Sequence, residues 1–260
     1  MPHAPPTPPS PEPNHTAPMT TNRTPNLLPD GSDSPRLLIS AGPTHEPIDS
    51  VRYIGNRSSG RLGIDLADTA ARAGWPVTLL LGPTAIRPIE ERVHLVRYTS
   101  TADLEGCLNE HLPGCDILVM AAAVADYTPA RPDPNTKLRR VPGKPLILEL
   151  CPTPDLLAGC SRQARSDQLL VGFALEPRAE LINSAHRKLE RKKIDLIVAN
   201  PLETMESASI EAQIIASPAL RDIQQSTNGQ ITKAEFAIWL LPTLLEAWTL
   251  KKARATSGAR

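Results

Sequence analysis

Short apolar segments alternate with amphipathic segments along most of this chain. The apolar segments predict β-strands over residues 36–42, 77–81, 93–98, 116–121, 146–150, 169–174, 195–200 and, as a short edge strand, 213–216. The amphipathic segments predict helices over residues 60–74, 102–112, 154–165, 180–193 and 233–250. Strands that alternate with helices of this length are typical of a parallel sheet covered on both sides. The sequence therefore predicts an α/β fold with a doubly wound, mostly parallel, Rossmann-like sheet and helices on both faces.

Proline is concentrated where this pattern is missing. The chain contains 28 Pro residues, and 11 of them lie within residues 1–35, which also have little apolar content. We expect a disordered, proline-rich tail there, because such a segment buries too little surface to offset its ordering entropy. A single domain is expected over residues 36–250, interrupted by a proline-rich loop at 128–145. This loop carries Lys137, and its composition predicts a mobile lid that closes over an anionic ligand.

Charge and cysteine content exclude several classes of protein. Lys plus Arg and Asp plus Glu each number 28, so the formal net charge is zero. We expect neither a nucleic acid nor a membrane as a partner, because both attract proteins with a basic excess and no apolar run is long enough to span a membrane. Residues 251–260 have four basic and no acidic side chains, and they predict a basic C-terminal tail. Four scattered Cys residues and the absence of a secretory signal predict reduced thiols and a cytoplasmic location.

A long polar connection follows the first predicted strand. It spans residues 42–60 and ends in Ser58, Ser59 and Gly60, directly before a predicted helix. In open α/β sheets, ligands bind beyond the carboxyl ends of the strands. Hydroxyl groups and free amides at a helix start are suited to a phosphate, while the alternative is an ordinary Ser N-cap. The segment lacks the GxGxxG pattern of a nicotinamide or flavin dinucleotide site.

Two further segments place candidate groups at the same edge of the sheet. Small residues at 121–125 leave room for a ligand beside the backbone, and Asp126 follows them; the alternative is tight helix packing with a capping Asp. Lys188 lies at the margin of the apolar stripe of its predicted helix and Lys192 lies within it, whereas Arg191 is expected to point elsewhere. An unpaired buried charge is costly, so the two lysines indicate an anion at the inner edge of this helix, unless they snorkel to solvent.

These segments resemble those of a known family. The segment 41–60 (AGPTHEPIDSVRYIGNRSSG), the segment 121–127 (AAAVADY) and the segment 137–140 (KLRR) resemble motifs of phosphopantothenoylcysteine synthetase. Residues 154–155, 171–174, 188–192 and 195–200 continue the resemblance in the family's order. The resemblance covers residues 36–200 of the chain.

The resemblance implies a ligase of coenzyme A biosynthesis. Members of the family join 4′-phosphopantothenate to L-cysteine: the carboxylate attacks the α-phosphate of a nucleoside triphosphate, and the amine of cysteine then attacks the acyl carbon. The resemblance implies CTP in preference to ATP, a requirement for Mg²⁺, and a homodimer. In many bacteria the synthetase follows a flavin-dependent decarboxylase. Because this chain has the proline-rich tail in that place, we expect a stand-alone synthetase without FMN.

The resemblance also implies roles for individual residues. Asn56 and Arg52 match residues that serve the acyl intermediate and its coupling to cysteine, and Lys137 matches the catalytic lysine of the lid over the triphosphate. The implied nucleotide-binding residues are Ala123, Asp126, Lys137, Thr153, Pro154, Asp155, Leu156, Phe173, Lys188 and Lys192. Ser58, Ser59 and Gly60 are the expected phosphate-binding residues, and the sequence assigns no metal ligand.

Two other functions stay open on the sequence alone. The chain has Thr153 where the family has Asn, and Pro201 where the family has Asp. Both departures also fit a nucleotide-binding scaffold or regulator without turnover. A nicotinamide-dependent reductase on a similar sheet is the third interpretation, and the missing glycine pattern disfavours it.

Overall fold

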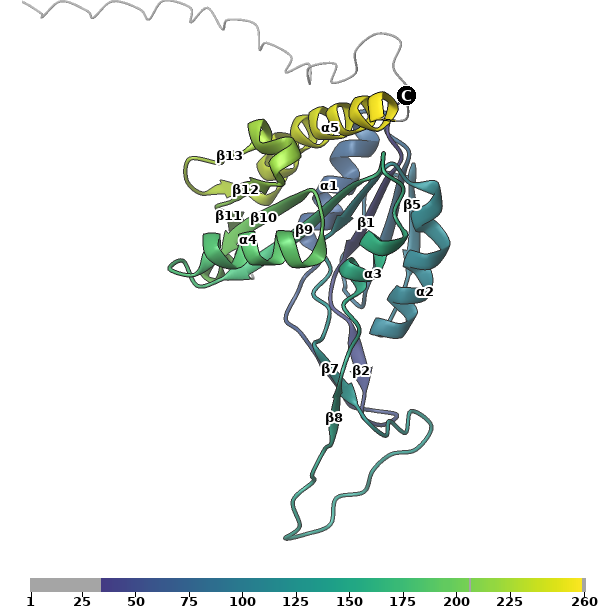
Figure 1. Ribbon diagram of the computed structural model, residues 1–260. Coiled ribbons are helices and arrows are strands. Elements are labelled where there is room, and N and C mark those ends of the chain that lie inside the picture. Colours follow the sequence, from purple (N-terminus) through teal and green to yellow (C-terminus); the bar gives the residue numbers. More distant parts are fainter. Residues whose placement is uncertain (1–33, 206, 259–260) are drawn as a thin grey trace, which may run out of the picture.

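One eight-stranded sheet forms the centre of the protein (Figure 1). The computed structural model describes residues 34–205 and 207–258. Six neighbouring parallel strands make up most of the sheet, in the order β10 (Leu196–Pro201), β9 (Leu169–Glu176), β6 (Ile117–Met120), β1 (Leu37–Ala41), β4 (Val77–Leu81) and β5 (Val93–Arg97). Two antiparallel strands follow beside β10, first β12 (Gln213–Ala216) and then β13 (Gln225–Ser226). The segment 213–216 is therefore a strand, as expected, but it is not the edge of the sheet.

The direction in which the sheet grows reverses at β1. Leu37 of β1 lies opposite Val77 of β4 on one side and opposite Ile117 of β6 on the other. From β1 the chain first adds β4 and β5 on one side, and from β6 onward it adds strands on the other side. Such a reversal leaves a crevice beyond the carboxyl ends of the two central strands, which here are β1 and β6.

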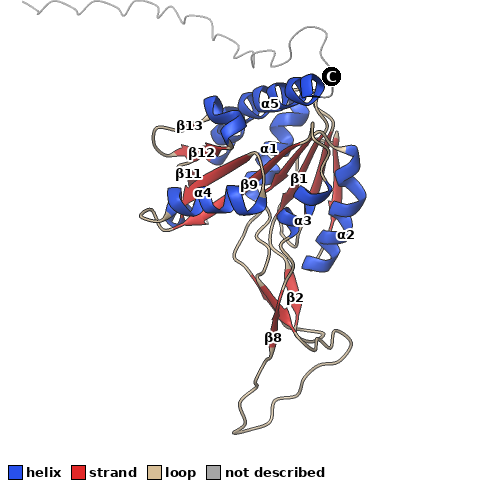
Figure 2. Ribbon diagram, viewed as in Figure 1, coloured by secondary structure: helices blue, strands red, loops and turns tan. Residues whose placement is uncertain are grey.

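Helices cover both faces of the sheet (Figure 2). α1 (Arg61–Arg72) and α5 (Lys233–Gly258) pack on one face, and the other face carries α2 (Thr101–His111), α3 (Leu156–Gln163) and α4 (Leu181–Lys192). Successive residues of β1 alternate between the two cores, with Leu37 and Ile39 in the first and Leu38 in the second. This arrangement confirms the predicted doubly wound α/β fold.

Two antiparallel ribbons project from the sheet as an arm, which comprises residues 45–55 and 127–152 (Figure 1). One ribbon pairs β2 (His45–Pro47) with β3 (Tyr53–Gly55), and the other pairs β7 (Tyr127–Pro129) with β8 (Leu150–Pro152). The two ribbons lie together because β2 contacts β7. The predicted lid loop, 128–145, begins in β7 and continues into the far end of the arm. The remaining elements are a small ribbon of β11 (Ser209–Ile210) with β14 (Ile231–Thr232) and three 3₁₀ turns at Leu112–Gly114, Leu202–Thr204 and Pro218–Ile223.

The expected strand over residues 146–150 is wrong. Only Leu150 of this segment is in a strand, and that strand belongs to the arm rather than to the central sheet. Ile147 is 86% exposed and Leu146 is 57% exposed. An apolar run forms a buried strand only where another element covers it, and the pattern of a single segment does not reveal the covering element.

The boundaries of two helices also differ from the expected ones. α3 begins at Leu156 instead of residue 154, because Asp155 is its N-cap and accepts a hydrogen bond from the Ala158 amide at 3.1 Å. α5 continues to Gly258, so residues 251–258 are helical rather than a tail. The reason is that these turns still contact the domain: the Lys251 ammonium donates to Asp195 at 2.6 Å.

Residues 1–33, which make up most of the predicted proline-rich tail, lie outside the described residues. Within the described ranges, no helix combines the length and the apolar character needed to cross a membrane.

Close contact between α1 and β1 gives a first prediction. Gly63 of α1 is buried, and a Cβ added there would press into the Cβ of Ala41 at the end of β1. We expect Gly63→Ala to lower the free energy of unfolding by about 1–3 kcal/mol, because overpacking forces backbone shifts. The matched control is Gly106→Ala in α2, where a Cβ meets open space. This substitution should instead raise the stability by about 0.5–1 kcal/mol. Urea unfolding measures both, and equal effects would contradict the proposed contact.

Candidate active site

The chain segments that follow β1 and β6 stay paired beyond the end of the sheet. The amide of Ala123 donates to the Gly42 carbonyl at 2.9 Å, and the Thr44 amide donates to the Ala123 carbonyl at 3.3 Å. The hydroxyl of Thr44 also accepts a hydrogen bond from the Ala125 amide at 3.0 Å. These bonds hold the two sequence segments that were singled out, 42–60 and 121–127, against each other at the reversal point.

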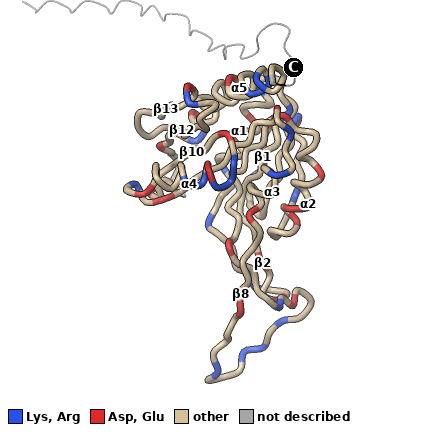
Figure 3. Tube along the Cα trace, in the orientation of Figure 1, with Lys and Arg blue, Asp and Glu red and all other residues tan. Residues whose placement is uncertain are grey.

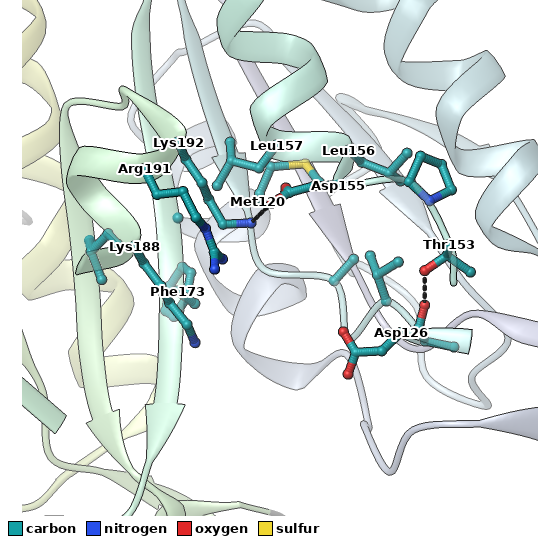
Figure 4. A pocket seen from close by; sticks show the side chains of 16 residues that line it. Met120, Asp126, Thr153, Asp155, Leu156, Leu157, Phe173, Lys188, Arg191 and Lys192 are labelled. Carbon is teal, nitrogen blue, oxygen red and sulfur yellow. Dashed lines mark hydrogen bonds and ion pairs between the residues drawn. The ribbon is translucent and has the colours of Figure 1, made fainter. Parts of the chain in front are cut away.

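A pocket of about 320 Å³ opens beside this pair of segments (Figure 4). Its walls come from the 121–127 segment, the turn before α3, strand β9 and helix α4. Eight of the ten predicted nucleotide-binding residues line it, namely Asp126, Thr153, Pro154, Asp155, Leu156, Phe173, Lys188 and Lys192. The structure therefore brings together side chains that are up to 66 positions apart in the chain (192 − 126).

Three cationic side chains of α4 reach one wall of this pocket. They are Lys188, Arg191 and Lys192, and they lie opposite Asp126 and Thr153 in Figure 4. The expectation that Arg191 points elsewhere is wrong, because its long side chain reaches the pocket although its position on the helix is exposed. Both lysines are half-buried and each pairs with a carboxylate, so the assumption of an unpaired buried charge is wrong, and the ammonium groups do not simply extend into solvent either.

Each lysine is held by one carboxylate. The Lys188 ammonium donates to Glu176 at 2.7 Å, and the Ser184 hydroxyl donates to the same oxygen at 2.9 Å. The bond from Lys188 lowers the pKa of Glu176, since it stabilises the ionised form. Lys192 donates to both oxygens of Asp155, at 2.6 and 2.7 Å.

Asp155 has an additional role at the start of α3. Burial acts to raise the pKa of Asp155, but the bond from Lys192 and the bond from the Ala158 amide outweigh it, so the pKa of Asp155 is lowered. The ionised carboxylate therefore both caps α3 and orients Lys192 beside the pocket.

Thr153 joins two walls of the pocket. Its hydroxyl donates to the Ala125 carbonyl at 2.6 Å, and its amide donates to the Asp126 carbonyl at 2.9 Å. The single hydroxyl proton of Thr153 is therefore used within the protein and is not free for a ligand. Asp126 makes no ion pair with any residue of the described ranges.

A second pocket, of about 240 Å³, adjoins the first and shares Ala122 and Phe173 with it. The three predicted phosphate-binding residues, Ser58, Ser59 and Gly60, line this second pocket together with Ala123. Three cations that the sequence analysis did not identify also line it, namely Arg57, Arg61 and Lys233. Partial burial lowers the pKa of Lys233.

Gly60, rather than a serine, is the N-cap of α1. Gly60 has a φ of 71° and makes no side-chain cap bond, so the interpretation of Ser58 or Ser59 as an ordinary N-cap is wrong. A left-handed φ of this kind favours glycine, which has no Cβ to clash. The first turn of α1 borders the second pocket, and its Arg61 amide donates to the Ser59 hydroxyl at 3.4 Å.

The three residues expected to be catalytic are placed differently from one another. The Asn56 amide donates to the carbonyl of Val124 at 2.8 Å, and Val124 lines the first pocket. Arg52 pairs with Asp49 and donates to the Leu138 carbonyl at 3.0 Å, so it lies at the base of the lid loop. Lys137 lines neither pocket and is exposed on the arm, where Figure 3 shows a series of basic residues. Asn56 and Lys137 thus both lie outside the two pocket linings, but Asn56 is joined to the wall of the first pocket through Val124 and Lys137 is not.

Two joined basic pockets at the reversal point of a parallel sheet define an α/β domain suited to anionic ligands. A comparison with protein families agrees with this class. Residues 33–247 match the model of the DNA/pantothenate metabolism flavoprotein C-terminal domain, and the chain belongs to that family.

Known proteins with similar sequences and structures extend this result. A cysteine/cysteine sulfinic acid decarboxylase from an unknown prokaryotic organism is 46% identical over 168 residues, which are 65% of this chain and 46% of that protein. The coenzyme A biosynthesis bifunctional protein CoaBC of Mycobacterium bovis is 43% identical over 173 residues, 64% of this chain and 41% of that protein. The chain thus spans less than half the length of these two curated relatives.

Among solved structures, the DNA/pantothenate metabolism flavoprotein of Streptococcus pneumoniae is similar with a TM-score of 0.71 and 26% identity. The match covers 82% of this chain and 99% of that one. The similarity extends over almost the whole described domain, and it confirms the Rossmann-like fold expected from the sequence.

The cations of α4 give a second prediction. Lys188→Gln removes one charge from the pocket and leaves Glu176 without its cation, so the site becomes less favourable for an anion. We expect the dissociation constant of a nucleoside triphosphate, measured by calorimetry, to rise by about tenfold or more. The matched control is Arg187→Gln, which removes the same charge from an exposed position of the same helix. Equal effects of the two substitutions would show that only net charge matters.

Proposed function

We propose that this protein is a phosphopantothenate–cysteine ligase of coenzyme A biosynthesis. It joins 4′-phosphopantothenate to L-cysteine through an acyl-nucleotide intermediate. The observation that carries the proposal is the pair of joined basic pockets at the reversal point of the sheet, since the first reaction step must bring two anions together. The family membership and the CoaBC relatives, whose name places them in coenzyme A biosynthesis, support it.

The first pocket takes the nucleotide in this proposal. Lys188, Arg191 and Lys192 neutralise phosphate charge, and Phe173 and Thr153 contact the rest of the nucleotide. We propose CTP as the preferred nucleotide, with ATP as the alternative. Because Thr153 donates its hydroxyl proton to Ala125, it offers a base only an acceptor. The amino groups of cytosine and adenine both donate, so selection between the two bases depends on other groups of the pocket.

Mg²⁺ fits this pocket only together with phosphate oxygens. In the described part of the chain, no group of three or more His, Cys, Asp or Glu side chains could hold a metal ion. Mg²⁺ is commonly bound by one or two carboxylates plus substrate phosphates, and Asp126 is the pocket carboxylate without a cationic partner among the described residues. When bound, the ion supplies charge neutralisation on the triphosphate.

The second pocket takes the phosphate of the other substrate or the departing pyrophosphate. The hydroxyl groups of Ser58 and Ser59 and the first turn of α1 offer hydrogen-bond donors, and Arg61 and Lys233 offer positive charge. In the first step the carboxylate oxygen bonds to the α-phosphorus and pyrophosphate leaves. In the second step the cysteine nitrogen bonds to the acyl carbon, loses a proton, and the nucleoside monophosphate leaves.

Asn56 and Arg52 serve the second step and Lys137 serves the first. Asn56 is bonded to Val124, which lines the first pocket. In this proposal the acyl carbon lies near Val124, between the nucleotide pocket and the second pocket. Lys137 reaches the triphosphate only if the lid loop moves, because it lies on the arm in this structure. The proposal therefore includes a closing movement of the loop 128–145 during the first step.

A third prediction tests these roles in one assay. The purified protein is incubated with 4′-phosphopantothenate, cysteine, Mg²⁺ and CTP or ATP, and pyrophosphate and the coupled product are quantified. We expect Asn56→Asp to form the acyl-nucleotide but to couple it slowly to cysteine, because Asp cannot donate to the Val124 carbonyl. We expect Lys137→Gln to suppress pyrophosphate release. Nucleotide binding without pyrophosphate release by the unmodified protein would favour the scaffold over the ligase.

We also propose that two copies of the chain associate through the arm. Apolar side chains are unusually exposed there, and the most exposed are Val51 (60%), Tyr53 (55%), Tyr127 (53%), Val141 (51%), Leu146 (57%) and Ile147 (86%). Exposed apolar surface of this kind marks an interaction site. A homodimer, which the family resemblance implies, would cover it.

The fourth prediction concerns this association. Light scattering after size-exclusion chromatography should give the mass of a dimer for the unmodified protein and a monomer for Ile147→Glu. Ile89→Glu is the control, since Ile89 is 77% exposed but lies outside the arm. A dimer that survives the first substitution, or that both substitutions disrupt equally, would place the interface elsewhere.

A further inference from the structure

A buried carboxylate that the proposed reaction does not use lies in the arm, at the end of the β2–β3 ribbon that is remote from the central sheet. Asp49, in the turn between β2 and β3, has a fully buried side chain. It accepts hydrogen bonds from the amides of Val51 at 2.9 Å and Arg52 at 2.8 Å. It also accepts two bonds from the Arg52 guanidinium, of which the Nε bond is 3.0 Å long.

One further bond of Asp49 crosses to the lid loop. The Leu138 amide, 89 positions along the chain, donates to the Asp49 carboxylate at 3.1 Å. The bonds to Val51 and Arg52 are those of an ordinary Asx turn. The bond from Leu138 is not, because a turn needs no partner from a distant segment.

The same turn holds the lid loop on both sides of Lys137. Before Lys137, the Ser50 amide donates to the Thr136 carbonyl at 2.9 Å. After it, the Arg52 guanidinium donates to the Leu138 carbonyl at 3.0 Å, in addition to the bond between Leu138 and Asp49. The main chain around Lys137 is therefore fixed to the turn, while the Lys137 side chain is exposed.

The loop beyond this point is attached differently. Between residues 139 and 148 of the described chain, the one hydrogen bond joins Lys144 to Val141 within the loop itself. The fixed segment thus ends at Leu138, and the part of the loop that follows is free to take other positions. Asp49 lies at the boundary between the two.

The charge of Asp49 suits this position. The Arg52 guanidinium is the main cause of a strongly lowered pKa at Asp49, and the three backbone amides add to it. A lowered pKa means that the carboxylate keeps its charge at neutral pH, and that the associated stabilisation is lost progressively as the pH falls below the ordinary pKa of Asp toward the lowered one.

We propose that Asp49 is a positioning residue that couples Arg52 to the Lys137 segment, so that both cationic groups are oriented by one carboxylate. The proposal rests on the proposed function, in which Arg52 and Lys137 act in successive steps. It adds that one carboxylate holds Arg52 and the main chain around Lys137 in a fixed position relative to each other. When the lid closes over the triphosphate, the main chain around Lys137 and the turn that carries Arg52 therefore move together.

The fifth prediction uses Asp49→Asn. The amide group of Asn directs N–H donors at groups that are themselves donors, so the holds on Arg52 and Leu138 are lost. We expect faster hydrogen exchange at the Leu138 amide and faster tryptic cleavage after Arg139 and Arg140. The rate of pyrophosphate release should fall by about tenfold to a hundredfold, because a small misplacement of a catalytic group is costly. The affinity for the triphosphate should change much less than this rate, since the residues that line the first pocket are untouched.

Asp116→Asn is the matched control. Asp116 also binds an arginine, since Arg36 donates to it from its amide at 2.9 Å and from Nε at 3.0 Å, but it lies at the opposite end of the sheet. If Asp49→Asn acted only by lowering stability, the two variants would have the same kinetic effect. That result would overturn the coupling.

A second variant covers the case in which Asp49→Asn does not fold. Leu138→Pro removes the amide donor and also restricts the backbone of Lys137 before it, while Asp49 keeps its bonds to Arg52. It should accelerate tryptic cleavage and slow pyrophosphate release; no change in either would overturn the proposal. Hydrogen exchange and proteolysis need no turnover. If the unmodified protein releases no pyrophosphate, the proposed function is wrong. If hydrogen exchange at the Leu138 amide is unchanged in Asp49→Asn, only the proposed coupling by Asp49 is wrong.

Discussion

The pairing of β1 with β6, continued past the ends of the two strands, is the constraint on which the site depends. In a parallel pair both chains leave the sheet at the same edge, and here they remain bonded through Gly42, Thr44 and Ala123. The small side chains at 121–125 permit this close approach. Without it, the polar connection after β1 and the turn carrying Asp126 would be two separate surface loops. With it, they form the shared wall of two adjoining pockets.

Although the chain has no net charge, several cationic side chains line the first pocket, and two of them pair with carboxylates beside it. Lys188 and Lys192 each have a carboxylate partner, so the charges are compensated in the absence of a ligand and the side chains are already directed toward the pocket. This arrangement reduces the entropy lost on binding, because the lysines do not need to be ordered by the ligand. It also sets a limit on affinity, since Glu176 and Asp155 stay beside any bound anion.

The sequence predicts the central sheet and much of the pocket, because both depend on local signals. The apolar strands, the small residues before Asp126 and the spacing of Lys188 and Lys192 are features of short segments. The arm was not predicted, since its four strands have three residues each and three of them contain a proline. Lys233 and Arg191 were missed for different reasons: the first reaches the second pocket from a distant helix, and the second from an exposed helical position. No local pattern relates Asp49 to Leu138, because the bond joins two loops.

The strand order also determines when this protein can acquire its shape during synthesis. β1 is the first strand to be made, yet its partners begin 40 and 80 residues later, at Val77 and Ile117. Contacts between such distant segments slow folding, because the intervening chain must be ordered first. The carboxyl ends of β1 and β6 can meet only after residue 120 has left the ribosome, and helix α4 follows some sixty residues after that. A ribosome-bound fragment that ends before α4 would present an apolar, half-completed sheet with one open edge, which is the form most exposed to aggregation.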